Sequence, residues 1–466
     1  MKMKLCIVCC ITLSAPAIAQ EIPPAQNVFF QNTPKVQPEL LLNQPSINTP
    51  TPAPIKEGSS LEERINFAIV NKEWQELEKL LSQYRTTTNF DLTLYDYGLG
   101  ALYRHQGRQR EAISLYRQIL ARQPDLHYPR FDLAMMLYED KRHAEAKIEL
   151  ETAAPHLAPP LQALVNQVLV NIEKSQEWKP TLGLNYESTN NVNQASDLRE
   201  LILGEAIFVR SEDSLPQDAH GIRYSIGATK EKNINGNHYI YTGAQLGGVN
   251  YWDNQDYSEV ILQSNLGYRH KDIKQSLGFI VEVNQNILGG NRYNQNYAAT
   301  LEYNRQLASK WQVSGNISHL QKRYEDDDLA SFYDGHANSA AGIVLYQPQP
   351  RWLVYAGADF TRDDLADQAE SSDRQGIRAG VVFADNQINI RSSIRYAQRD
   401  FWADNFLYGK ERKDDEYQFS TTIGHKRFNW NGFMPKLNYA YQKIDSNLPL
   451  YERNNSTVFM QIDKAF

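Results

Sequence analysis

The sequence has almost no cysteine. All three cysteines among its 466 residues lie in the first ten positions, at Cys6, Cys9 and Cys10. If that segment is removed on secretion, the mature chain has none, which excludes thiolate metal sites, thiol catalysis and disulfides. A surplus of basic residues is missing too. The 48 Lys and Arg against 55 Asp and Glu give a formal charge of −7, so we expect no nucleic acid partner.

Long apolar runs are also missing. Beyond the N-terminus no stretch of about 18 apolar residues occurs, which excludes a helical membrane protein. Tyrosine, by contrast, is abundant: there are 27 Tyr against 17 Phe in a chain that is 41% hydrophobic. That hydrophobic fraction is too high for a disordered chain. A tyrosine-rich but polar composition is typical of an outer-membrane β-barrel, because half of each strand faces water.

Two N-terminal segments precede the expected folded parts. Residues 1–19 have the pattern of a secretory signal peptide, with Lys2 and Lys4 before an apolar core and a small-x-small cleavage site that ends at Ala19. Residues 20–58 hold eight prolines among many Gln and Asn, without periodicity. We expect a proline-rich disordered or extended linker there, because it lacks the apolar surface that would offset ordering entropy.

Residues 59–177 are predicted to be helical and contain a repeat of about 34 residues. Small residues recur at this spacing where paired helices must approach closely: Gly100 and Ala134, Ala112 and Ala146. This spacing predicts a tetratricopeptide-like solenoid, in which Lys141 replaces the usual turn glycine. Residues 61–84 look like a degenerate first helix pair, and residues 161–174 look like a closing helix.

From Trp178 to Phe466 the apolar period changes to 2, the period of β-strands. Fourteen strands are predicted, at 179–193, 221–234, 238–252, 257–271, 275–289, 296–309, 310–323, 338–347, 351–363, 373–384, 387–400, 416–428, 433–445 and 454–466. Connections after even-numbered strands are short. Those after odd-numbered strands are expected to be mostly long: 194–220, 253–256, 290–295, 324–337, 364–372, 401–415 and 446–453.

The segregation of loop length favours a membrane barrel. A soluble sandwich would alternate in the same way, but only outer-membrane barrels place short turns at one end and long loops at the other. Phe466 supplies the terminal aromatic of a barrel-assembly signal, so barrel-assembly machinery and outer-membrane lipid are expected partners. We therefore predict a multi-domain α + β chain: an N-terminal α-helical solenoid over 59–177, then a 14-stranded antiparallel transmembrane β-barrel over 178–466.

Three local strings and this domain order resemble a known family. The strings are NVNQAS (191–196), GIRYSIGATKEKNINGNHY (221–239) and YWDNQDYSE (251–259). Together they resemble the surface lipoprotein assembly modulator (Slam) family, over roughly residues 60–466. The resemblance implies an outer-membrane translocator with its helical domain in the periplasm. It would deliver client proteins, either surface lipoproteins or secreted haemophore-like proteins, without a cofactor. Segment 20–58 matches no feature of that family.

Three groups of residues are predicted to serve transport. Client binding is expected on the concave helical face, at Tyr97, Arg104, Tyr128, Phe131, Met135 and Tyr138, although Phe131 and Met135 could equally pack between repeats. The lumen is expected to contain Arg223, Glu282, Arg391 and Arg395. A lateral seam between the first and last strands is expected at Asn190, Asn191, Asn193, Asn454 and Asn455, where non-β-forming residues would pair weakly; the alternative is that these are ordinary loop residues.

No catalytic motif appears, so no enzymatic activity, catalytic residue or resident metal is predicted. The acidic loop 324–337 carries Glu325 to Asp328 and Asp334; it is expected to be solvated, with a calcium site as the alternative. Two other functions remain open at this point. Tetratricopeptide-plus-barrel chains also export polysaccharides, and a diffusion porin could carry a helical appendage.

Overall fold

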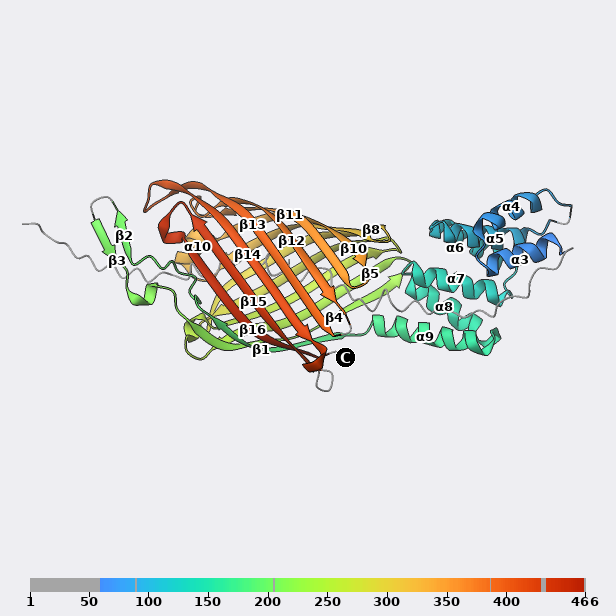
Figure 1. Cartoon of the computed structure of the whole chain (residues 1–466), viewed down its shortest axis with the longest axis horizontal. Helices are drawn as coiled ribbons and strands as arrows, with labels where there is room; N and C mark the ends of the chain where they lie inside the picture. Colours follow the sequence, from blue (N-terminus) through green and yellow to red (C-terminus); the bar gives the residue numbers. More distant parts are fainter. Residues whose placement is uncertain (1–58, 89, 204–205, 386, 429–432, 465–466) are drawn as a thin grey trace, which may run out of the picture.

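The computed structural model describes residues 59–466 apart from 89, 204–205, 386, 429–432 and 465–466 (Figure 1). The predicted signal peptide, segment 20–58 and Phe466 lie outside the described residues. The helices lie beyond one end of a β-barrel, which we call the helix-side end. A small hairpin of β2 (Glu200–Leu203) and β3 (Ala206–Val209) lies beyond the opposite end, which we call the far end.

Among the described residues, seven α-helices precede the barrel and pack as three helix pairs with a closing helix. They are α3 (Leu61–Val70), α4 (Trp74–Tyr84), α5 (Leu92–His105), α6 (Gln109–Arg122), α7 (His127–Glu139), α8 (His143–Ala153) and α9 (Pro159–Ser175). Ser60 begins the domain in a reciprocal capping box with Glu63. Gly100 lets α5 approach α6, because a Cβ there would lie 2.5 Å from the ring of Tyr116. The repeat and the closing helix are as the sequence predicted.

Fourteen antiparallel strands form a closed barrel, in which each strand pairs with its neighbours in the chain and β1 pairs with both β4 and β16. The strands are β1 (Lys179–Thr189), β4 (Ala219–Asn235), β5 (His238–Tyr251), β6 (Glu259–Lys271), β7 (Gln275–Leu288), β8 (Asn291–Ala308), β9 (Trp311–Tyr324), β10 (Gly335–Gln349), β11 (Trp352–Leu365), β12 (Ser372–Ala384), β13 (Ile388–Asn405), β14 (Lys410–His425), β15 (Phe433–Ser446) and β16 (Arg453–Lys464). The predicted number and order of strands are confirmed.

The expected loops at the far end need correction. Predicted loop 290–295 is a two-residue turn, Gly289 and Gly290, whose φ angles of 55° and 84° suit a tight hairpin that favours glycine. Predicted loop 401–415 is mostly strand, because β13 and β14 extend toward each other. The remaining long loops contain the β2–β3 hairpin and α10 (Asp327–Tyr333), neither of which was predicted.

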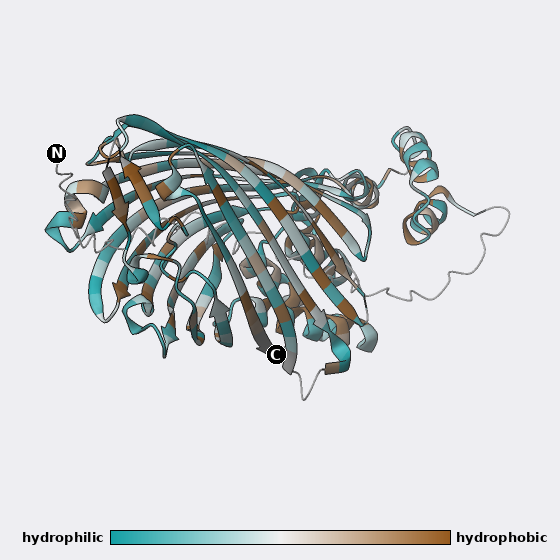
Figure 2. Cartoon of the chain, turned by 60° about the vertical axis from the view of Figure 1, so that its left-hand side comes forward, coloured by the Kyte–Doolittle hydropathy of each residue, from teal (hydrophilic) through white to brown (hydrophobic). Residues whose placement is uncertain are grey.

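Hydrophobic and hydrophilic residues alternate along the strands (Figure 2), and many of the large apolar side chains of the barrel are exposed on its outer surface. In β7, Val281 and Val283 are exposed on the outside, and Glu282 occupies the opposite phase. Trp311 and Trp352 begin β9 and β11 at the helix-side end, as a girdle at a membrane interface would require. This pattern is that of a membrane-spanning barrel. Within the described residues, no helix is long and apolar enough to cross a membrane.

The outer face can be tested at neighbouring positions of β13. Ile394 is 60% exposed, whereas Ser393 faces inward, with its Oγ 2.7 Å from that of Ser420. Ile394→Lys should destabilise the barrel by about 2–4 kcal/mol near the bilayer midplane. Ser393→Lys, one residue away on the water-facing side, should be tolerated. Heat-modifiable gel migration measures the folded fraction, and equal tolerance of both variants would show that this surface does not face lipid.

Candidate functional site

Most residues predicted to bind a client pack within the helical domain instead. Phe131 is buried in its core, and Tyr97, Met135 and Tyr138 are partly buried against the same core. Phe131, Met135 and Tyr138 lie on α7, which packs on α6 and α8, and Tyr97 lies on α5 against Tyr116 of α6. For Phe131 and Met135 the structure shows the alternative, packing between repeats, whereas Tyr97 and Tyr138 are less exposed than the prediction required. Tyr128, at the start of α7, is 53% exposed and remains available to a partner.

Polar side chains join α5 to α7 across successive repeats. The hydroxyl of Tyr97 donates to Asp132 Oδ2 at 2.7 Å, and Arg104 forms an ion pair with Glu139. Burial raises the pKa of the Asp132 carboxyl, while the hydrogen bond from Tyr97 acts to lower it. Burial and the nearby Asp132 carboxylate raise the pKa of Tyr97. These contacts fix the repeats in register, so Tyr97 and Arg104 have structural partners of their own.

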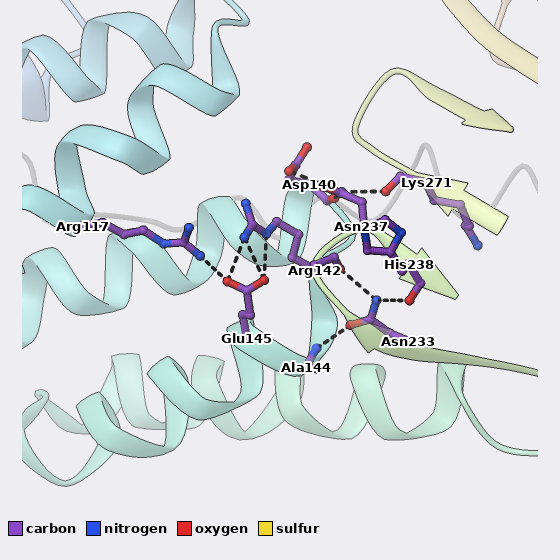
Figure 3. A network of polar contacts seen from close by, with 10 residues as sticks. Arg117, Asp140, Arg142, Ala144, Glu145, Asn233, Asn237, His238 and Lys271 are labelled. Atoms are coloured by element: carbon purple, nitrogen blue, oxygen red, sulfur yellow. Dashed lines mark hydrogen bonds and ion pairs between the residues drawn. The ribbon is translucent and has the colours of Figure 1, made fainter. Parts of the chain in front are cut away.

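The helical domain is attached to the barrel at the turn between β4 and β5 (Figure 3). Asn233 Oδ1 accepts the N–H of Ala144 at 2.8 Å, at the start of α8. Asn237 Nδ2 donates to the carbonyl oxygen of Asp140 at 2.6 Å and to that of Lys271 at 2.7 Å. The hydroxyl of Tyr239 donates to the carbonyl oxygen of Lys141. Side chains at one barrel turn thus supply hydrogen-bond partners to backbone groups of the α7–α8 turn.

Lys141 adopts the left-handed conformation, with φ 64°, at the position where the preceding repeat has Gly107. Lysine is strained in this region whereas glycine is not. Lys72, at the equivalent place in the first helix pair, also adopts this conformation, with φ 59°. The carbonyl oxygen of Lys141 accepts the hydroxyl of Tyr239, a backbone contact that does not depend on the side chain at position 141. A second attachment lies at the β6–β7 turn, where Lys274 Nζ donates to the carbonyl oxygen of Gly107 at 3.3 Å. The two attachments hold the domain over β4 to β7.

Charged side chains line the interior of the barrel as mutual pairs. Arg223 pairs with Glu187, which also accepts from the hydroxyl of Tyr251 at 2.7 Å. On the opposite wall, Arg395 Nη2 lies 2.6 Å from Asp359 Oδ2, and Arg378 also binds Asp359. Arg391 and Arg395 lie on the same face of β13, and the exposed Ile394 lies on the other face. In β7, Glu282 likewise lies on the face opposite its exposed neighbours. The predicted lumen residues therefore occupy the inward phase.

The seam between β1 and β16 has the shortest register of the described barrel. It runs from Asn185 opposite Gln461 to Thr189 opposite Thr457, five pairs, whereas β1 pairs with β4 along all eleven of its residues. The paired part lies at the far end. At the helix-side end, the described residues Ile462–Lys464 of β16 pair with Phe433–Pro435 of β15.

The predicted seam asparagines strengthen the far end rather than weaken it. Asn190 Oδ1 accepts the N–H of Ser456 at 2.8 Å, and Asn191 Nδ2 donates to the carbonyl oxygen of Asn454 at 2.9 Å. Asn455 Oδ1 accepts the hydroxyl of Thr189 at 2.7 Å. Asn193 binds within the adjoining loop, to the carbonyl oxygen of Leu215. Weak pairing was wrongly placed here, because side-chain amides supply hydrogen bonds that low β-propensity did not reveal.

Comparison with known proteins decides the family. A family model described as surface lipoprotein assembly modifier matches residues 178–466, and one for the N-terminal TPR repeats of the same family matches residues 55–150. The chain belongs to the surface lipoprotein assembly modifier family. The family resemblance noted in the sequence is therefore confirmed.

The modifier is similar to curated proteins over most of its length. It is 27% identical to a surface lipoprotein assembly modifier of Pasteurella multocida, over 86% of this chain and 81% of the relative. It is 25% identical to surface lipoprotein assembly modifier 1 of Haemophilus influenzae, over 86% and 83%. It is 22% identical to a hemophilin secretion modulator of Acinetobacter baumannii, over 88% and 86%.

One of the three strings that carried the resemblance lies at the attachment of the helical domain, one lies at the seam, and the third, residues 251–259, lies between β5 and β6 at the far end. Residues 191–196 border the seam, and residues 221–239 include Asn233 and Asn237. The acidic residues of 324–337 cap α10 of the modifier: Asp326 Oδ1 accepts the N–H of Leu329 at 3.0 Å. In the part of the chain that the structure describes, no cluster of three His, Asp or Glu is arranged to hold a metal ion.

Docking of the helical domain should weaken in acid through His143 of α8. Burial, with the charges of Lys141 and Lys271, lowers its pKa to about 4, against the opposing charge of Glu231. The pKa of this histidine is lower in the folded than in the unfolded state, so protonation favours the unfolded state. The folded state therefore has its full stability above about pH 6.5 and loses part of it as the pH falls toward 4. At pH 5 the loss should be about 2 kcal/mol.

Helix unfolding followed by circular dichroism at 222 nm measures this loss. The His143→Phe variant should lose most of the difference between pH 7 and pH 5. Asp140, whose pKa burial raises, acts in the opposite direction at lower pH. An unchanged pH dependence in His143→Phe would assign the effect to another group.

Proposed function

We propose that this modifier carries a client protein across the outer membrane, either a surface lipoprotein or a secreted haemophore-like protein. The observation that carries the proposal is the direct attachment of a helical repeat domain to the mouth of a 14-stranded barrel. The names of its relatives, which refer to surface lipoprotein assembly and hemophilin secretion, support the same function. A transport role is proposed, with no catalytic step.

In this proposal the helix-side end faces the periplasm and the far end faces the medium. The tight turns at the helix-side end support this orientation, because outer-membrane barrels have short periplasmic turns and longer outer loops. The chain would reach the membrane through its signal peptide and the barrel-assembly machinery. Domain limits at 59–177 and 178–466 fit the change from α9, which ends at Ser175, to β1, which begins at Lys179.

The helical domain receives the client and the barrel gives it a path. Tyr128 and the half-exposed Arg104–Glu139 pair form the part of the predicted face that a client can reach. A 14-stranded barrel with a wall of large charged side chains is too narrow for a folded domain. The client therefore passes unfolded, or the barrel opens between β1 and β16.

Deletion of the gene tests this function and identifies the client. Intact wild-type and deletion cells are treated with protease, and the released surface peptides are compared by mass spectrometry. We expect at least one lipoprotein, or one secreted protein, to be made in normal amount but lost from the surface or medium. Expression of the full chain should restore it. An unchanged surface and secreted proteome would contradict protein transport, and altered polysaccharide or solute passage would favour an exporter or a porin.

A further inference from the structure

Two lysines lie on the outer face of β4, close to the helical domain. Ile226 and Ile234, which are 58% and 53% exposed, mark that face, and Lys230 and Lys232 lie between them in the same phase of the strand. The strand ends at Asn235, in the turn that holds α7 and α8. Both lysines therefore lie on the lipid-facing wall, near its helix-side boundary.

Neither lysine has a carboxylate partner among the described residues. The contact that Lys230 makes is with the ring of Trp178, whose centroid lies 5.7 Å from its Nζ. Glu231, which separates the two lysines in the chain, faces the lumen and pairs there with Arg269 and Lys271, at 3.1 Å and 2.5 Å. The one carboxylate of β4 is thus used inside the barrel, and two positive charges remain on the outside.

Outward lysines near the far end differ, because carboxylates lie beside them. Lys413 lies 3.8 Å from Asp400, and Lys443 lies 2.6 Å from Asp445. At the helix-side end of β4 to β6, by contrast, the described outward strand positions hold no Asp or Glu. The negative charge that balances the two lysines of β4 must therefore come from outside the described chain.

Polar aromatic side chains of β5 and β6 extend the two lysines into a patch. Lys232 is opposite Ile240 of β5, which is opposite Tyr268 of β6. The hydroxyl of Tyr268 is hydrogen-bonded to Nδ1 of His238, and the ring of His270 packs edge-on against His238 with centroids 5.4 Å apart. We call this group the outer basic patch; its members are Trp178, Lys230, Lys232, His238, Tyr268 and His270.

The position of the patch selects a partner from the headgroup layer of the membrane. Within hydrocarbon an unpaired ammonium group is strongly unfavourable, so lysine side chains on a lipid-facing wall extend toward the headgroups. Tryptophan and tyrosine favour the same layer, and Trp178 and Tyr268 are 53% and 44% exposed. A lysine ammonium group has three donors and no acceptor, which suits the oxygens of a phosphate.

We propose that the outer basic patch binds the phosphate of an anionic phospholipid at the membrane surface beside the helical domain. A zwitterionic headgroup carries its own ammonium group, so it balances the two lysines less well. With the orientation proposed above, this surface belongs to the periplasmic leaflet. The inference goes beyond transport of a client and does not depend on it.

The same end of the opposite wall has a different chemistry. On β9 to β12 the outer face carries two aromatic pairs there, Trp311 with Tyr346 and Trp352 with Phe383. The described outward strand positions of β9 to β12 at this end include no Lys or Arg. An anionic headgroup is therefore expected on the wall to which the helical domain is attached, and not on the opposite one.

Native mass spectrometry of the purified full chain tests the site. The chain in detergent receives equal amounts of phosphatidylglycerol and phosphatidylethanolamine with the same acyl chains, and the bound lipids are identified. We expect the wild-type chain to retain phosphatidylglycerol preferentially. Lys230→Gln with Lys232→Gln should lower this preference about fivefold for each lysine. Lys413→Gln with Lys443→Gln, which removes the same charge at the far end, should leave it largely unchanged.

Equal retention of the two lipids by the wild-type chain would overturn the proposal, as would an unchanged preference in the Lys230→Gln/Lys232→Gln variant. Heat-modifiable gel migration checks that both variants are folded. A measurement on the wild-type chain does not depend on their folding: phosphatidylglycerol with a photoreactive headgroup should label peptides of β4 to β6. Labelling confined to β9 to β12 would contradict the site.

Inorganic phosphate distinguishes a lipid site from a site for a free anion. Added in millimolar excess, it should displace little phosphatidylglycerol, because it has no acyl chains to lie along the wall. Complete displacement would overturn the assignment to a lipid. No client enters any of these measurements, so their failure leaves the transport proposal standing, and an unchanged surface proteome in the deletion strain leaves the lipid site standing.

Discussion

A disulfide between Thr189→Cys and Thr457→Cys should stop delivery of the client to the cell surface, and its reduction should restore delivery. The two threonines face each other across the seam, where Thr457 Oγ1 donates to Thr189 Oγ1 at 3.4 Å. Cysteine sulfurs at these positions lie within reach of a disulfide. Beyond Cys10 the sequence has no cysteine of its own, so no native thiol of that part of the chain competes for the bond.

The effect is expected to be large because a covalent link prevents strand separation altogether. Oxidised cells should deliver no more client than the deletion strain, as measured by protease accessibility of the tagged lipoprotein. The matched control is Ser318→Cys with Ser339→Cys, which joins β9 to β10 at positions whose hydroxyl oxygens are 2.6 Å apart. That bond should leave delivery unchanged. Normal delivery by the oxidised seam variant would show that the client passes without opening β1 from β16.

Asn233→Ala with Asn237→Ala should release the helical domain from the barrel. The two amides bind Ala144 and Asp140 across the domain boundary, and Asn237 also joins Lys271. Removing a partner from a buried polar group costs about 1–3 kcal/mol. The double variant should therefore lose several times more free energy of domain docking than a substitution on the exposed surface would. Client delivery should fall sharply while the barrel remains folded.

Hydrogen exchange measures this release directly. Amides of 140–146 should exchange faster in the double variant, and strand amides of β9 to β13 should not. Asn304→Ala is the control, because its side-chain oxygen accepts the hydroxyl of Ser314 at 2.6 Å, a bond between β8 and β9 within the barrel. Unchanged exchange at 140–146 would mean that other contacts hold the domain. Normal client delivery by a variant whose domain is released would show that transport does not need the attachment.

Periodicity was enough to predict the architecture. The change from helical to strand period at Trp178 and the alternation after it gave the number and order of the strands, because every strand has one apolar face. Loop lengths were less certain. Gly289 and Gly290 form a two-residue hairpin, so residues that looked like a loop belong to strands. The polar ends of β13 and β14 extend beyond the apolar band and carry no outward apolar signal.

The candidate site was harder to predict because it depends on tertiary contacts. Tyr97 and Tyr138 fall on the concave positions of a generic repeat, but packing on α6 and α8 partly buries them. Asn190 and Asn191 looked like weak strand formers, yet their amides bind across the seam. The domain attachment through Asn233 and Asn237 had no signal of its own in the sequence, because their amides bind backbone groups of the α7–α8 turn.

Reconstitution tests transport most directly. Vesicles holding only the purified full chain, with the helical domain outward, receive the tagged lipoprotein identified from the deletion strain. We expect the tag to become protected from added protease as the client enters the vesicles, and to stay sensitive in vesicles with the oxidised Thr189→Cys/Thr457→Cys chain. A client that stays fully protease-sensitive with the folded, unlocked chain would contradict translocation by this protein.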